Sequence, residues 1–245
     1  MESTFMISSQ AGTPPFLGTA FVMGRPFPNQ TITPERPGKV RYVLITAAHV
    51  LDGIQGDTAI VYFRHNVAPG VWVPLPTPVP IRAGGHPLWT KNPNADVAVM
   101  YIRIPNAATM PNVLLSTDLL ADDAQLSHFD IHPGDELFCL GFPFGERASA
   151  GYFPILRSGT IASFPLLPTS ETKTFLFDFR VFKGNSGGPV YIAQSDRVYG
   201  GVVHLGESLH FIVGLVSEES IYNEQFVGQY STEQHEYQLG LAVVI

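Results

Sequence analysis

The stretch Lys183-Gly184-Asn185-Ser186-Gly187-Gly188-Pro189 places one serine inside a turn in which three of seven residues are glycine. Backbone N–H groups can crowd around such a side chain, because glycine adopts the positive φ angles that aim them at one point. Acyl transfer needs this arrangement, since its tetrahedral intermediate develops negative charge on an oxygen atom. The pattern predicts that Ser186 is a nucleophile and that the amides of Gly184 and Ser186 form an oxyanion hole. A glycine-rich turn without chemistry is the alternative for this segment alone.

A serine nucleophile needs a base, and the base needs a partner that fixes its tautomer. The apolar, strand-like run 43–48 ends at His49, and Asp96 stands where the apolar run 97–102 begins. Taken singly, His49 is also compatible with a core histidine and Asp96 with a turn residue that caps its own backbone. Taken together with Ser186, they predict a Ser-His-Asp triad.

The three segments, in the chain order His49, Asp96, Ser186, resemble the chymotrypsin-like (trypsin-fold) serine peptidases, and within them the bacterial, disulfide-free, HtrA-like members. Further matching segments cover nearly the whole chain: 18–22, 134–143, 214–217 and 239–243. The resemblance implies an all-β fold of two six-stranded antiparallel Greek-key β-barrels, with the active site in the cleft between them. It also implies a serine endopeptidase that hydrolyses peptide bonds through an acyl-enzyme intermediate.

The resemblance extends to substrate binding. Counting back from Ser186 puts Arg180 at the floor of the pocket for the side chain that precedes the cleaved bond, where a guanidinium favours an acidic residue. Glu219 and Gly240 are expected to line the same pocket. A preference for small apolar side chains is the rival, with Arg180 pointing outward or pairing with Glu219. The backbone of an extended polypeptide substrate is expected to pair with the edge strand that ends at Ser217.

Composition restricts the class of partner. The chain has 21 acidic and 14 basic residues, a net charge of −7 and no basic run, so nucleic acid is not expected as a partner. No stretch approaches the ~18 uninterrupted apolar residues of a membrane span, and the start lacks the pattern of a signal peptide. Cys139 is the only cysteine, so no intrachain disulfide can form. These features favour a cytoplasmic location.

The 23 glycines and 21 prolines punctuate many short runs of strand length. The predicted strands are 4–8, 17–23, 42–46, 58–64, 71–75, 97–104, 136–141, 156–164, 174–179, 189–193, 197–205, 211–217 and 239–244. A short helical turn is expected at 47–52, and the Glu- and Gln-rich segment 218–238 is expected to be a polar loop. Apolar density falls at 105–132. We therefore expect a first barrel at 1–120 carrying His49 and Asp96, and a second at 121–245 carrying Ser186 and the substrate pocket.

Three further expectations concern chemistry and regulation. No cofactor or metal is expected, because His128 and His132 lie in a polar segment without the register of a ligand pair. Asn185 stands where secreted relatives have an acid, so activation by a salt bridge to a new N-terminus is not expected. The chain stops at Ile245, directly after its last strand, which suggests a regulatory partner or an additional domain beyond Ile245.

Two other functions stay open. The same fold serves as a non-catalytic peptide-binding module, a pseudoprotease, because a fold does not confer chemistry. A non-peptide acyl hydrolase would use the same triad. Substrate chain length and the reactivity of Ser186 distinguish these possibilities.

Overall fold

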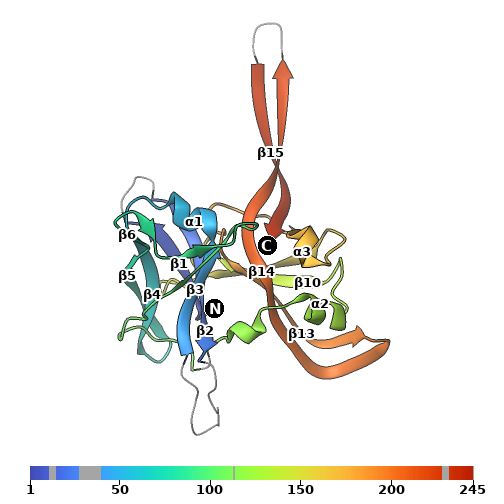
Figure 1. The fold of residues 1–245 in the computed structure, drawn as a ribbon, viewed down its shortest axis with the longest axis horizontal. Helices are drawn as coiled ribbons and strands as arrows, with labels where there is room; N and C mark the ends of the chain where they lie inside the picture. The colour runs from blue at the N-terminus through green and yellow to red at the C-terminus, as the bar shows by residue number, and fades with distance from the viewer. Residues whose placement is uncertain (11–14, 28–39, 113, 228–231, 245) are drawn as a thin grey trace.

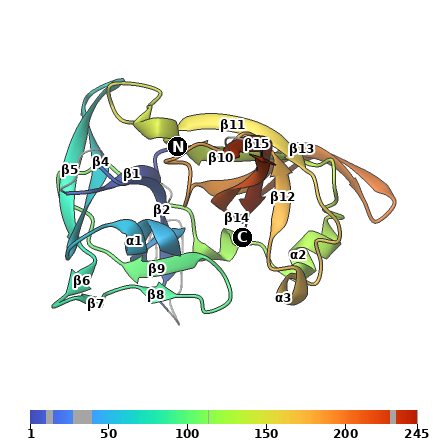
Figure 2. The same cartoon turned by 90° about the horizontal axis from the view of Figure 1, so that it is seen from above.

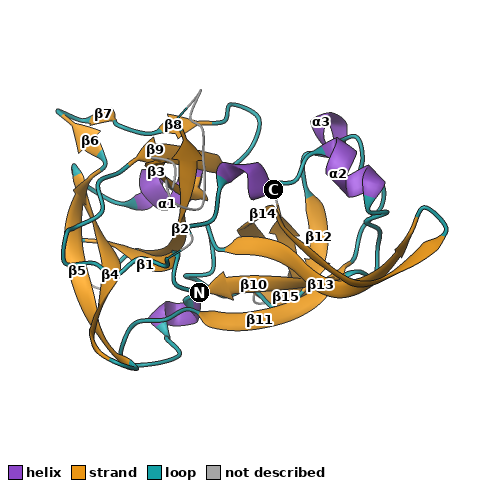
Figure 3. Ribbon diagram, turned by 90° about the horizontal axis from the view of Figure 1, so that it is seen from below, coloured by secondary structure: helices purple, strands orange, loops and turns teal. Residues whose placement is uncertain are grey.

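The structure is a computed structural model, and it is dominated by β-strands (Figure 1). It describes residues 1–10, 15–27, 40–112, 114–227 and 232–244, and for residues 219–240 it describes the backbone alone. The helices are short; α2 (Asp123–His128) and α3 (Thr169–Thr172) lie together at one edge of the molecule, and α1 (Ala48–Gly53) lies beside β3 (Val40–Ala47) (Figure 3). The predicted all-β class is confirmed. Among the described residues, no helix is both long and apolar enough to cross a bilayer.

The first half of the chain forms a sheet of seven strands in the order β5-β4-β1-β2-β3-β9-β8. Its strands are β1 (Thr4–Ser9), β2 (Leu17–Pro26), β3 (Val40–Ala47), β4 (Thr58–Ala68), β5 (Val71–Pro80), β8 (Thr90–Lys91) and β9 (Val97–Tyr101). The small strands β6 (Arg82–Ala83) and β7 (His86–Pro87) pair with each other, and helix α1 (Ala48–Gly53) follows β3. Valine, isoleucine, tyrosine and phenylalanine are frequent in β3 and β4, because branched and aromatic side chains pack well on a pleated surface.

The second half forms a closed barrel in the order β10-β11-β12-β15-β14-β13. Its strands are β10 (Glu136–Gly141), β11 (Ile155–Ile161), β12 (Phe175–Asp178), β13 (Pro189–Tyr199), β14 (Val202–Val227) and β15 (Thr232–Val244). The short helices are η1 (Thr117–Leu119), α2 (Asp123–His128), η2 (Pro143–Gly145) and α3 (Thr169–Thr172). Figure 2 shows this barrel beside the first sheet.

The two halves share one strand order. We match β1, β2, β3, β4, β5 and β9 in turn to β10 through β15. Every neighbour pair among these six strands then has its equivalent in the second half. The difference is that the second ring is closed, whereas in the described backbone β5 and β9 do not pair and β8 extends the first sheet beyond β9. The prediction of six strands in a closed ring thus holds for the second half, and the first half is a seven-stranded open sheet.

The core consists of two apolar clusters, of which the first also includes Ile212 and Leu215 of β14. Phe5, Phe21 and Leu44 belong to the first, and Phe177 and Val190 belong to the second. The connection between them crosses at η1: Ser116 bridges to Gly24 of β2, and Leu120 bridges to Ile212 of β14. The domain boundary near residue 120 stays a prediction.

Two predicted segments are wrong. Residues 197–205 are not one strand but the end of a hairpin, in which Tyr199 pairs with Val202 around Gly200 and Gly201, both at positive φ. Residues 218–238 are not a loop, because β14 and β15 continue as a paired ladder from Ile221↔Gln238 to Val227↔Thr232. Figure 1 shows the β14–β15 hairpin as an arm that rises from the barrel and the β13–β14 hairpin as a second arm low on the right. The first error missed a local signal, because a Gly-Gly pair at positive φ favours a two-residue hairpin turn. The second arose because polar composition does not exclude a strand whose partner supplies the pairing.

Candidate active site

His49 projects from the first turn of a helix that starts directly after a buried strand. Strand β3 ends at Ala47 and α1 begins at Ala48. Ala48, Val50 and Leu51 are buried against the first core, whereas the side chain of His49 is 42% exposed. The helix therefore uses its apolar residues for anchoring and holds the imidazole ring at the surface.

Asp96 lies opposite this helix start, because β9 pairs with β3 through Ala47↔Val97. Its Oδ1 accepts a hydrogen bond from the backbone N–H of His49 at 2.8 Å, and its Oδ2 lies 2.5 Å from Nδ1 of the ring. One carboxylate thus fixes both the backbone and the ring of His49. The structure brings together the first two residues of the predicted triad and leaves Nε2 of the imidazole free of Asp96.

A third group reaches the same carboxylate from the second barrel. The Ser217 hydroxyl donates to Asp96 Oδ2 at 2.8 Å, and Ser217 is 5% exposed. Burial acts to raise the pKa of Asp96, but the hydrogen bonds from His49 and Ser217 outweigh it, so the pKa lies below its usual value. Asp96 is therefore ionised at neutral pH. The sequence predicted Ser217 as a substrate contact and gave no signal for this hydroxyl bond.

The loop that carries Ser186 is docked onto both halves. The Thr19 N–H donates to the Ser186 carbonyl at 2.9 Å, and the Gly187 N–H donates to the Val216 carbonyl at 2.7 Å. Gly187 has a φ of +85°, and a Cβ there would overlap the carbonyl oxygen of Thr19 and Oγ1 of Thr46. Only glycine fits this close approach. Ser186 therefore lies beside β3, which ends two residues before His49. The Ser186 hydroxyl makes no hydrogen bond to another described residue.

The peptide before the serine has a defined orientation. Gly184 has a φ of +99°, and a Cβ there would overlap the Phe142 carbonyl oxygen. The Lys183 carbonyl accepts a hydrogen bond from the Phe144 N–H at 2.6 Å. A trans peptide directs its C=O and N–H in opposite directions, so the Gly184 N–H points away from Phe144. Within the described part of the chain, the amides of Gly184 and Ser186 both lack an acceptor.

The predicted specificity residues are only partly described. The Arg180 side chain is exposed, and its carbonyl accepts a hydrogen bond from Arg157 Nη1 at 2.6 Å. The Arg157 guanidinium lies 4.2 Å from the ring centre of Phe179. Glu219 and Gly240 belong to β14 and β15, in the stretch for which the structure describes the backbone alone. Their place in a substrate pocket, like that of Arg180, stays a prediction.

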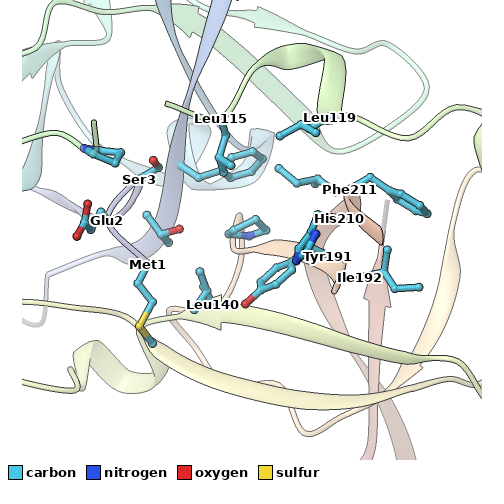
Figure 4. Close-up of a pocket in the computed structure, with 15 residues that line it drawn as sticks. Met1, Glu2, Ser3, Leu115, Leu119, Leu140, Tyr191, Ile192, His210 and Phe211 are labelled. Carbon is cyan, nitrogen blue, oxygen red and sulfur yellow. The ribbon is translucent and has the colours of Figure 1, made fainter. Parts of the chain in front are cut away.

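A separate hollow of about 480 Å³ lies between the N-terminal segment, the connection around η1 and strands β13 and β14 (Figure 4). Met1 and Glu2 face it from one side, and Tyr191 and His210 face it from the other. None of the triad residues lines it. In the described ranges, no three histidine, cysteine, aspartate or glutamate side chains are arranged to hold a metal ion.

A comparison with known protein families identifies the class of the chain. Residues 18–200 match the family described as trypsin-like peptidase domain. The chain belongs to that family.

Similar solved structures have low sequence identity. Protease Anisep from Arthrobacter nicotinovorans is 15% identical, with a TM-score of 0.47 over 100% of this chain and 89% of the other. The thermostable serine protease AL20 from an extremophilic microorganism is 12% identical, with a TM-score of 0.43 over 86% and 90%. The scabies mite inactivated protease paralogue S-D1 is 11% identical, with a TM-score of 0.49 over 100% and 86%. A search of curated proteins finds no match.

Proposed function

We propose that the protein is a serine endopeptidase in which Ser186 is the nucleophile, His49 the general base and Asp96 the residue that orients the base. The observation that carries the proposal is the pair of contacts by which the Asp96 carboxylate binds both the backbone N–H and the ring Nδ1 of His49. Because Nδ1 contacts Asp96, Nε2 is the ring nitrogen that can accept the Ser186 proton. The family to which the chain belongs makes peptide bonds the first class of substrate to test.

The chemistry follows from these positions. Ser186 Oγ attacks the substrate carbonyl while His49 Nε2 takes its proton, and His49 then passes that proton to the leaving amine. Asp96 stays ionised, because its pKa is held low by the bonds from His49 and Ser217, and it stabilises the imidazolium that forms. Water then hydrolyses the acyl-enzyme through the same base.

The oxyanion hole is formed by the amides of Gly184 and Ser186. Each donor of this kind stabilises the tetrahedral intermediate by about 3 kcal/mol. The proposal is supported by the orientation of the Lys183–Gly184 peptide, whose carbonyl bonds to Phe144 and whose N–H has no acceptor among the described residues.

An extended substrate binds along β14. The last paired residue of β14 on its β13 side is Leu215, although the strand itself continues to Val227. The edge that begins near Ser217 is therefore open on that side in the described backbone, and a peptide can add to it as a further strand. The prediction that the strand ends at Ser217 is wrong, because β14 continues to Val227, and pairing of the substrate with this edge stays a prediction. Arg180 selects an acidic residue before the cleaved bond, with small apolar residues as the rival preference.

The test is cleavage of an extended peptide library by the parent and by Ser186→Ala, followed by mass spectrometry. The proposal expects internal cleavage by the parent alone, enriched in Asp or Glu before the cut if Arg180 lines the pocket. Binding of peptides without cleavage would favour the pseudoprotease. Cleavage of small esters but of no peptide would favour the acyl hydrolase.

A further inference from the structure

Thr19 connects the first sheet to the nucleophile loop through its side chain. It lies on β2 and is fully buried, at 0% exposure. Its hydroxyl donates to the Gly184 carbonyl at 2.6 Å and accepts a hydrogen bond from the Phe142 N–H at 3.3 Å. The second barrel supplies both of these partners. A buried hydroxyl bonded on both sides is costly to lose, because each partner would then lack a hydrogen bond in a site closed to water.

These bonds determine the conformation of Gly184. The φ and ψ angles of a residue describe how its two flanking peptide planes are turned relative to each other. The plane before Gly184 is held by the bond from the Phe144 N–H to the Lys183 carbonyl, and the plane after it by the bond from Thr19 Oγ1 to the Gly184 carbonyl. Glycine has no Cβ to restrict its backbone, so its φ of +99° must be held by such outside contacts.

The Thr19 hydroxyl contributes to both of the contacts that orient the peptide planes of Gly184. Phe142 and Phe144 belong to the turn around η2, and Thr19 Oγ1 bonds to the Phe142 N–H of that turn. The Thr19 hydroxyl therefore acts on both peptide planes of Gly184. It fixes the turn whose Phe144 N–H holds the plane before Gly184, and it bonds directly to the carbonyl of the plane after Gly184.

We propose that Thr19 is a positioning residue for the oxyanion hole, supplied by the first sheet to a loop of the second barrel. The inference rests on the proposed function and deepens it. Thr19 acts through Gly184 and has no role as a substrate contact. Its backbone N–H donates to the Ser186 carbonyl at 2.9 Å whatever its side chain. A substitution at Thr19 therefore removes the hydroxyl bonds and leaves this backbone link between the halves intact.

The decisive variant is Thr19→Val, which keeps the shape of the side chain and removes the hydroxyl. We expect kcat to fall by about 10- to 100-fold, less than for removal of an oxyanion donor outright, because the Gly184 amide is misaligned but present. The KM should change by less than about 3-fold, since the interaction is made in the transition state. Thr19→Ser keeps the hydroxyl and should stay within about 3-fold of the parent.

A second readout separates positioning from packing. A peptide boronate forms a tetrahedral adduct with an active-site serine, so its affinity should fall in proportion to kcat/KM in Thr19→Val. Binding of an uncleaved peptide, measured with Ser186→Ala and with the Thr19→Val, Ser186→Ala double variant, should be equal. The matched control is Thr109→Val, which removes a hydroxyl that accepts the Asn66 N–H at 3.0 Å within the first half. It should lower the melting temperature without changing the ratio of boronate to peptide affinity.

The outcomes are distinguishable. An active parent with a folded and equally active Thr19→Val overturns this inference alone. A parent that is never acylated overturns the proposed function and this inference with it. If Thr19→Val does not fold, Thr19→Cys carries the same expectation with a smaller loss, because a thiol is a weaker donor than a hydroxyl. Parent-like kcat and boronate affinity in a folded Thr19→Cys would equally contradict the proposal.

Discussion

The two halves of the molecule are built on the same strand order, but they hold their functional residues differently. The open first sheet holds His49 and Asp96 against each other with bonds made inside that half. The closed second barrel holds Ser186 on a loop whose contacts include Thr19 of the first sheet. Conversely, the Ser217 hydroxyl of the second barrel donates a hydrogen bond to Asp96 of the first sheet. The difference indicates that His49 is positioned mainly by bonds within its own half, whereas the loop of Ser186 depends on the contact between the halves.

The largest effect is expected from breaking the pair inside the first sheet. Asp96→Asn replaces the carboxylate by an amide, which holds the ring of His49 in the wrong tautomer and does not stabilise its cation. We expect kcat/KM to fall by about 10⁴-fold with the fold retained. Steady-state cleavage and circular dichroism measure the two properties, and a loss of less than about 10-fold would show that Asp96 does not orient the base.

The next effect tests a structural contact between the halves. Arg64 is 1% exposed, and its guanidinium donates to the Tyr152 carbonyl of the second half at 2.8 Å and to the Glu2 carbonyl at 2.6 Å. Burial lowers its pKa to about 10, so it stays charged at neutral pH. Arg64→Met leaves these carbonyls unpaired and should lower the free energy of unfolding by about 3 kcal/mol.

Arg82 offers a matched control for that variant. It also donates to backbone carbonyls, those of Leu51, Ile54 and Gly56, but all of them belong to the first half. Arg82 is only partly buried, so water can replace it at these carbonyls. Urea unfolding of Arg82→Met should show a smaller loss, of about 1 kcal/mol. Equal losses for the two variants would mean that the contact between the halves adds no stability.

A smaller, pH-dependent effect is expected at Ser217. Because the pKa of Asp96 is lower in the folded protein than in the unfolded chain, its ionised form stabilises the fold above the unfolded pKa of about 3.9. That stabilisation is lost as pH falls through the lower folded pKa. Ser217→Ala removes one of the bonds to the carboxylate and should cost about 1 kcal/mol at pH 7. Urea unfolding as a function of pH should show the difference from the parent shrinking in acid, and a constant difference would contradict the account.

The smallest effect concerns the interior of the closed barrel. Cys139 on β10 is 1% exposed, and burial raises the pKa of its thiol to about 12. We expect iodoacetamide at pH 8 to leave the native protein unlabelled over the time in which the urea-unfolded chain reacts fully. Rapid labelling of the native protein would show that the closed ring opens more readily than its strand pairing indicates.

The sequence predicted the parts of the site that depend on local pattern. As a triad, Ser186, His49 and Asp96 stay a prediction. As candidates, Ser186 in its glycine-rich turn, His49 after an apolar run and Asp96 before one were recognisable from local pattern. The hydroxyls of Ser217 and Thr19 were not, since each acts on a residue more than a hundred positions away along the chain. Small polar residues inside strands carry no signal of their partner until the strands are arranged in space.

In the fold, too, local features were predicted better than long-range ones. The alternating strands of both halves were predicted, but the hairpin around Gly200 and Gly201 was merged into one strand. The opening of the first ring between β5 and β9 was not foreseen either, because closure depends on long-range pairing. Local pattern determines where strands form, and long-range pairing determines how far they extend.

Whether Ser186 is an activated nucleophile is measured by the intact mass of the protein after incubation with a serine-directed fluorophosphonate, beside Ser186→Ala. Such a reagent phosphonylates a serine that a base activates and an oxyanion hole supports: an O–P bond forms and fluoride leaves. The account predicts one adduct on the parent and none on Ser186→Ala. A folded parent without an adduct, or an equal adduct on Ser186→Ala, would contradict it.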